Sequence, residues 1–254
     1  MRRAALKRLL AAAVALAVLP AAGAGAAVVL EVDDLVLRAD ARYRPQQLPR
    51  HRFAPIAFSG FVGFGGRNGR PVPALQRAAI AFDHDGRLGV AGLPRCDPAR
   101  IEAASTREAR RACRGAIVGR GTLGAVILLP GDPVRVRAAL TVFNGPRLDG
   151  RPTAILHART EVPVQHTYAI VVPITRSRGD FRYRVAIDVP PLAGGLGRVT
   201  RLQVRLDRRY RAGGKSRSYL SARCSDSILR VHGYFRFADG TVVSGALEKF
   251  CDAR

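Results

Sequence analysis

Apolar and polar positions alternate along most of this chain. In the stretch FRYRVAIDV every second side chain is apolar, and Arg182 and Arg184 occupy the opposite face. The stretch VRVRAALTV repeats the pattern, with Arg135 and Arg137 opposite the apolar face. Alternation with a period of two is typical of strands that bury one face.

Turn-forming sequences separate the alternating stretches. They include DHDG, PGD, NG, LDG, AGG and ADG, which combine glycine with residues that favour tight turns. Roughly a dozen short strands joined in this way indicate antiparallel pairing. The pattern therefore predicts a mainly β protein with an antiparallel β-sandwich-like architecture.

One stretch, CDPARIEAASTREARRAC, has helical character and a cysteine at each end. A straight helix would hold Cys96 and Cys113 about 25 Å apart, whereas a disulfide needs Cα atoms within about 7 Å. The sequence DP supplies an N-cap and a first-turn proline, and STRE, beginning at Ser105, is a capping box. We therefore expect a short two-helix insert at about 97–113 with a break near Ser105.

The chain has four cysteines, at positions 96, 113, 224 and 251. An even number in an exported chain favours two disulfides over metal ligands or catalytic thiols. Three pairings are possible. The folded-back insert favours a bond from Cys96 to Cys113, which leaves Cys224 to pair with Cys251.

Residues 1–27 have the three-part order of a signal peptide, with basic residues, an apolar run and a small-residue stretch. An uncleaved membrane anchor is the alternative, since no charge interrupts the region from Leu9 to Leu30. Cleavage would leave residues 28–254 as a secreted or cell-surface β-sandwich domain. Two tightly joined β halves, with a boundary near 125–150, are the other possibility.

The chain is strongly basic, with a formal net charge of +23. Because the leader holds four basic and no acidic residues, the rest carries +23 − 4 = +19. Such a field attracts anionic partners, although an arginine-rich composition is also what a high-GC genome produces. We expect an anionic cell-envelope polymer or lipid surface as partner. The strands lack the exposed aromatics of nucleic-acid binders, so we expect no specific nucleic-acid recognition.

The candidate anion-contact residues are the arginines on outward strand positions. They are Arg135, Arg137, Arg182, Arg184, Arg205, Arg230 and Arg236. If several share one sheet face, they form an anion-binding surface. The alternative is a set of solvated side chains scattered over two sheets.

Signals for catalysis are weak. The chain has no G-x-S-x-G, and none of its histidines forms an H-x-H or H-x-x-x-H pair. Asp83, His84 and Asp85 form the densest polar cluster and could offer ligands for a cation, but we favour a hairpin turn with Asp85-Gly86 at positive backbone angles as their explanation. The sequence GKS is interpreted as a hairpin turn as well. We nominate no catalytic or metal-binding residue and expect no cofactor.

Four sequence blocks resemble those of a known group. CRGAIVGRG, FNG, GKSRSYLSARC and FADGT are similar to blocks in uncharacterised secreted, disulfide-containing proteins of high-GC actinobacteria. The resemblance implies export and paired cysteines, and it carries no activity or functional residue.

Three functions fit these observations. The favoured hypothesis is a non-enzymatic secreted or cell-surface protein whose arginine-rich surface contacts anionic envelope polymers or membranes. The second is a secreted hydrolase whose site assembles from residues distant in sequence. The third is a carrier of an apolar ligand, which requires a sizeable internal cavity.

Overall fold

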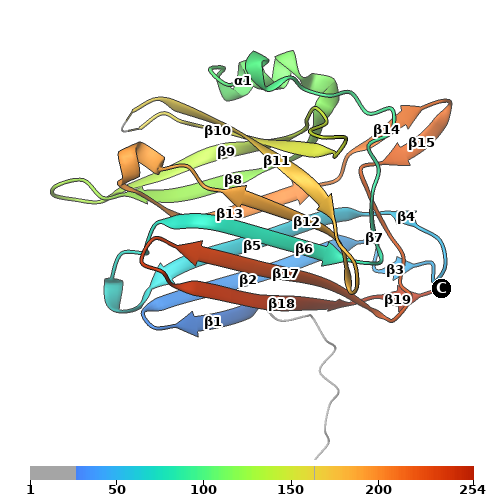
Figure 1. Cartoon of the computed structure of the whole chain (residues 1–254), viewed down its shortest axis with the longest axis horizontal. Helices are drawn as coiled ribbons and strands as arrows, with labels where there is room; N and C mark the ends of the chain where they lie inside the picture. Colours follow the sequence, from blue (N-terminus) through green and yellow to red (C-terminus); the bar gives the residue numbers. More distant parts are fainter. Residues whose placement is uncertain (1–26, 163) are drawn as a thin grey trace, which may run out of the picture.

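The computed structural model describes residues 27–162 and 164–254. The chain is mainly β, as the alternation predicts, and twelve strands form one antiparallel sheet (Figure 1). Their spatial order is β1 (Val28–Val32), β2 (Leu35–Arg44), β5 (Ala57–Gly66), β13 (Gly197–Leu206), β8 (Ile117–Ile127), β9 (Val134–Asn144), β10 (Thr153–Thr160), β11 (His166–Arg176), β12 (Phe181–Asp188), β6 (Leu75–Asp83), β17 (Ile228–Phe237) and β18 (Val242–Phe250). Strands from both sides of 125–150 belong to this sheet.

Smaller elements lie around the large sheet. The short strands are β4 (Ala54–Pro55), β16 (Leu220–Ala222) and β7 (Gly86–Leu88) in one sheet, the pair β14 (Arg209–Ala212) and β15 (Lys215–Ser218), and the parallel pair β3 (Gln47–Leu48) and β19 (Asp252–Ala253). The helical elements are α1 (Thr106–Ala112) and the 3-10 turns η1 (Arg67–Gly69), η2 (Pro98–Arg100), η3 (Arg114–Ala116) and η4 (Leu192–Gly195). Of the described helices, none has the length and apolar composition needed to cross a membrane.

The large sheet curls until its two edge strands meet. β1 and β18 share no ladder, but the Lys249 ammonium of β18 lies 2.8 Å from the Asp40 carboxylate of β2. A Cβ on Gly245 would lie only 2.8 Å from Leu30 Cδ1, so glycine allows β1 and β18 to approach closely. The sheet is therefore nearly closed around an interior.

Apolar side chains from opposite halves of the sheet pack together inside it. Phe64 of β5 contacts Phe235 and Phe237 of β17 edge to face, with ring centroids 5.3 and 5.4 Å apart. Strands β5 and β17 are not neighbours in the sheet, so these contacts join facing layers. The alternation predicted that the strands would bury such an apolar face.

The ladder between β11 and β12 is short. Only Ile174–Arg176 pairs with Tyr183–Val185, after which the strands diverge, although β11 begins at His166 and β12 continues to Asp188. We call this stretch the β11–β12 seam. It is the shortest ladder between neighbouring strands of the large sheet.

The insert has the predicted break at Ser105. The Ser105 side chain accepts a hydrogen bond from Glu108 N–H, and Glu108 accepts one from Ser105 N–H, which completes the capping box. Of the two expected helices, α1 is an α-helix, whereas the first is a single 3-10 turn begun by Asp97 and Pro98. Cys96 and Cys113 are bonded with their Cα atoms 5.3 Å apart.

The second disulfide joins Cys224 to Cys251, with a Cα separation of 6.0 Å. Both predicted pairings are therefore confirmed. Two disulfides are typical of proteins that fold in an oxidising environment. The predicted leader, apart from residue 27, lies outside the described residues.

Candidate functional site

The interior of the large sheet is incompletely filled. Its largest cavity has a volume of about 240 Å³, and cavities of about 140 and 90 Å³ share lining residues with it. The shared residues include Phe82, Leu156 and Leu202, which remain only partly buried although they face the core. Protein interiors are normally close-packed, and a cavity of about 150 Å³ is large enough to bind benzene.

The largest cavity is apolar except at one end. Most of its lining comes from aliphatic and aromatic side chains of the large sheet, and strands β7 and β16 of the three-stranded sheet cover one end. At that end the lining includes Asp83, Arg87, Arg230 and Lys249. The cavity therefore offers an apolar volume with charged groups at one side.

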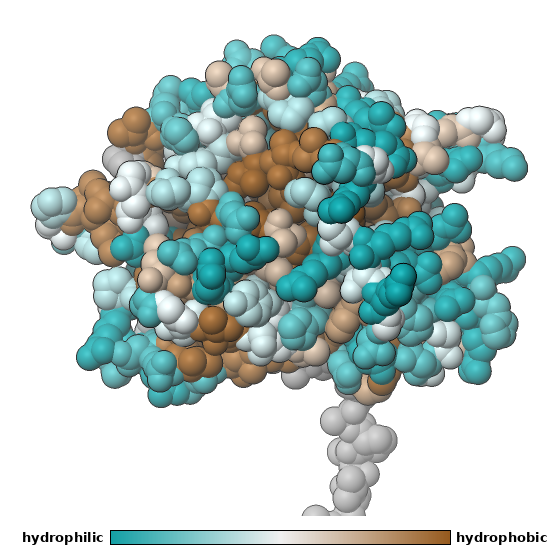
Figure 2. Space-filling model, in the orientation of Figure 1, coloured by the Kyte–Doolittle hydropathy of each residue, from teal (hydrophilic) through white to brown (hydrophobic). Residues whose placement is uncertain are grey.

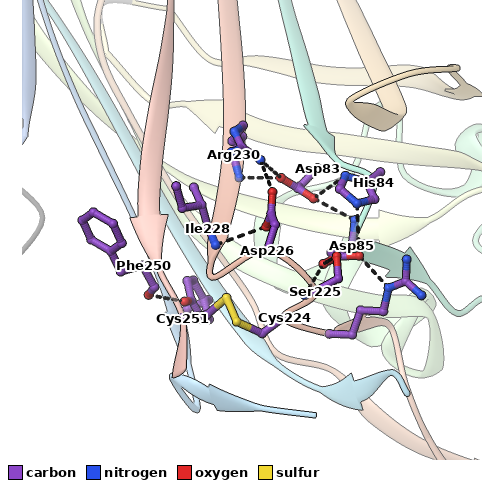
Figure 3. Close-up of a disulfide and its surroundings, with 12 residues drawn as sticks. Asp83, His84, Asp85, Cys224, Ser225, Asp226, Ile228, Arg230, Phe250 and Cys251 are labelled. Carbon is purple, nitrogen blue, oxygen red and sulfur yellow. Dashed lines mark hydrogen bonds and ion pairs between the residues drawn. A yellow bond between two sulfur atoms is a disulfide. The ribbon is translucent and has the colours of Figure 1, made fainter. Parts of the chain in front are cut away.

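Of these groups, Arg87 lies on β7, Arg230 on β17 and Lys249 on β18. Asp83 begins the turn between β6 and β7, which Figure 3 shows beside the Cys224–Cys251 disulfide. The sequence-based interpretation of this turn as a hairpin is wrong. β6 and β7 do not pair with each other, and neither Asp85 nor Gly86 has a positive φ. The turn instead carries the chain from the large sheet into the three-stranded sheet.

Both carboxylates of this turn are buried and saturated with donors. Asp83 is 4 % exposed and accepts hydrogen bonds from the backbone N–H groups of Asp85 and Arg230, at 2.7 and 2.8 Å. Asp85 is fully buried and accepts bonds from Arg223 Nε at 2.5 Å, Ser225 N at 2.7 Å and Ser225 Oγ at 2.6 Å. These partners satisfy the charges that burial would otherwise penalise.

The two carboxyl groups respond differently to burial. For Asp83, burial raises the pKa above its ordinary value, against the two backbone hydrogen bonds. For Asp85, burial works in the same direction, but the hydrogen bonds from Ser225 and Arg223 outweigh it and lower the pKa. Asp85 is therefore the firmly ionised member of the pair.

His84 lies between the carboxylates and completes the only group of metal-ligand type found among the described residues. Its ring nitrogens lie 3.2 Å from Asp83 and 3.4 Å from Asp85. A cation would have to displace the arginine and backbone donors that already occupy these oxygens. The geometry is that of a structural polar cluster, and we assign no metal to it.

The cluster also lacks the arrangement of a hydrolase. Ser225 Oγ donates to Asp85 rather than to a histidine nitrogen, so no histidine among the described residues is placed to accept its proton. The nearby histidine, His84, contacts the carboxylates and leaves Ser225 unactivated. The residues that converge here lock the turn to the start of β17.

Three arginines surround one aromatic ring next to this turn. The guanidinium groups of Arg87, Arg182 and Arg223 lie 5.6, 5.2 and 5.4 Å from the centroid of Phe53. Arg182 occupies a register shift at the start of β12 and donates to the His84 carbonyl at 2.6 Å. This bulge directs Arg182 towards the turn, so positive charge gathers at this end of the sheet.

The seven predicted anion-contact arginines are divided between two regions. Arg135 and Arg137 lie on β9 and Arg205 on β13, on either side of β8; Arg182 and Arg184 lie on β12 and Arg230 and Arg236 on β17, on either side of β6. Two of them are neutralised by acidic partners, since Arg205 pairs with Asp207 and Arg230 with Asp226. The seven arginines therefore form two separate groups instead of one continuous surface, and each group contains one arginine that already has an acidic partner.

A second group of arginines, which sequence reasoning missed, lines a surface pocket of about 570 Å³. Arg147 and Arg151 flank the LDG turn before β10, and Arg176 ends β11. The only local signal was two arginines around one predicted turn. Figure 2 shows an apolar area over the region where Figure 1 draws β11, with hydrophilic side chains to its right.

We compared the chain with protein-family models, curated proteins and solved structures, and none of them matches it.

Proposed function

We propose that this chain is an exported, non-catalytic binding protein that takes up an apolar molecule, or the apolar part of one, inside its nearly closed sheet. The incompletely filled interior carries this proposal. Partly accessible Phe82, Leu156 and Leu202 would become buried against such a ligand, with a gain of about 25 cal/mol for each Å² of apolar surface removed from water.

The test is titration with N-phenyl-1-naphthylamine, a neutral apolar dye whose fluorescence rises in apolar surroundings. We expect saturable binding to the native protein. Ala154→Phe should weaken it at least about tenfold, because Ala154 lines the largest cavity. Ala139→Phe is the matched control, since Ala139 is exposed on β9. Absence of dye binding, or equal loss in both variants, would refute the proposal.

A second candidate function is contact with an anionic surface, such as an envelope polymer or lipid. The β14–β15 hairpin supports it, since Arg209, Arg211, Lys215 and Arg217 are exposed and make no ion pair within the described part of the chain. Retention that weakens with salt would support this role.

A further inference from the structure

The pocket that contains Arg147, Arg151 and Arg176 adjoins the interior cavity. Leu88, Ile174 and Tyr183 line both spaces, so a wall one side chain thick separates them. We call this pocket the basic pocket. A molecule with a charged head and an apolar tail would place each part in matching surroundings if that wall opened.

The arginines of the basic pocket form no ion pair with an acidic side chain of the described residues. Within residues 27–162 and 164–254, no carboxylate forms an ion pair with Arg147, Arg151 or Arg176. Asp149 is exposed on the turn between two of them without pairing with either. Three unneutralised guanidinium groups at one pocket attract carboxylate or phosphate groups, which they bind with paired N–H donors.

The turn that holds two of these arginines is well defined. Leu148 and Arg151 exchange backbone hydrogen bonds of 3.0 and 2.8 Å, and Arg147 Nη1 donates to the Gly150 carbonyl at 2.6 Å. Arg176 approaches from the end of β11, where Ile174 N–H donates to the Pro152 carbonyl at 2.9 Å. The backbone therefore fixes the rim of the pocket before any ligand arrives.

The wall lies at the β11–β12 seam. Tyr183 is 9 % exposed, and its hydroxyl accepts a long hydrogen bond of 3.4 Å from Leu88 N–H. Beyond Ile174–Arg176, no ladder joins β11 to β12. Displacing the Tyr183 ring would therefore break few hydrogen bonds while connecting the basic pocket to the cavity.

We propose that the ligand is an amphiphile with an anionic head, whose carboxylate or phosphate binds Arg147, Arg151 and Arg176 while its alkyl chain passes Tyr183 into the interior. This inference rests on the proposed function, because the tail needs the apolar cavity. It adds the chemical class of the ligand and the end from which it enters.

The experiment compares three probes that each carry a chain of sixteen carbons: palmitate, lysophosphatidate with a palmitoyl chain, and neutral hexadecanol. Each displaces N-phenyl-1-naphthylamine from the native protein. We expect at least one anionic probe to bind about tenfold more tightly than hexadecanol, a difference of about 1.4 kcal/mol. The two anionic arms distinguish a carboxylate head from a phosphate head, and inorganic phosphate alone should displace no dye.

The double variant Arg151→Gln/Arg176→Gln should remove the preference for the anionic probe and leave hexadecanol binding unchanged. Arg135→Gln/Arg137→Gln removes the same charge from exposed positions on β9 and is the matched control. If anionic and neutral probes bind equally, or both double variants act alike, the inference is overturned while the proposed function stands. If the dye binds but no probe displaces it, the inference is likewise overturned while the proposed function stands; if the dye itself does not bind, both fail.

Discussion

At the scale of single residues, His157 is a titratable side chain whose pKa is set mainly by burial. It lies on β10, fully buried beneath the insert, where its Nε2 contacts the Ala104 carbonyl at 3.2 Å. Burial lowers the pKa of His157 below its ordinary 6.5, outweighing the hydrogen bond to Ala104, and the nearby Arg110 charge adds to the effect. The folded protein therefore holds this ring neutral.

The pKa of His157 makes folding stability depend on pH. Below pH 6.5 the unfolded chain takes up a proton that the folded protein resists, so the free energy of unfolding should fall as pH falls from 6.5 towards the lowered pKa. His157→Gln, which keeps an N–H donor, should flatten this dependence in urea denaturation. The exposed His51 provides the control variant His51→Gln. Equal slopes in native protein and His157→Gln would contradict the assignment.

At the scale of elements, the insert is held by packing and by its disulfide. Ile101 and Ala109 pack with Phe143 and Ile155 on the outer face of β9 and β10. This small apolar contact and the bond between Cys96 and Cys113 fix the fold-back at Ser105. The insert therefore lies outside the cavity that we propose as the binding site.

Removing this disulfide should lower stability without abolishing binding. For Cys96→Ala/Cys113→Ala, we expect a loss of about 3 kcal/mol, because the unfolded chain regains the freedom of the closed loop. Thermal denaturation measures the loss, and dye titration should give the native affinity. A variant that kept full stability would show that packing alone holds the insert; one that lost dye binding would tie the insert to the site.

The elements that the sequence predicts correctly are those that depend on residues close together in the chain. Strands, the capping box and the Gly213-Gly214 turn of β14–β15 depend on neighbouring residues, and local pattern identified each. The turn at Asp83–Asp85 was misjudged because Asp-Gly serves hairpins and other turns alike. Its burial depends on Arg223 and Arg230, which lie far away in sequence. Closure of the sheet and the proximity of Arg147 to Arg176 likewise depend on contacts between residues that are not neighbours in the sequence.

At the scale of the whole molecule, the basic charge is uneven. The turn beside Phe53, the basic pocket and the β14–β15 hairpin lie at the end where β6 and β11 finish. At the opposite end, exposed Val162, Val164 and Leu196 surround a groove of about 390 Å³. The molecule therefore presents a basic end and an apolar end.

This asymmetry predicts how the protein adsorbs to vesicles. It should sediment with vesicles that contain phosphatidylglycerol, remain free of phosphatidylcholine vesicles, and detach as salt rises. Arg209→Gln/Arg211→Gln at the basic end should reduce adsorption more than Arg135→Gln/Arg137→Gln on β9. Adsorption that is indifferent to salt, or equal in both variants, would argue against the surface role.

The short β11–β12 ladder has a consequence for motion. Together with the unpaired meeting of β1 and β18, it divides the sheet into a panel of four strands, β12, β6, β17 and β18, and a panel of eight. Long ladders join the strands within each panel. Along the sheet, the panels are connected by the β11–β12 seam and by the contact between the β1–β2 edge and β18. We therefore expect any opening of the sheet to begin at these two connections, because no long strand pair has to separate there, and the contacts of Phe64 with Phe235 and Phe237 across the interior to oppose it.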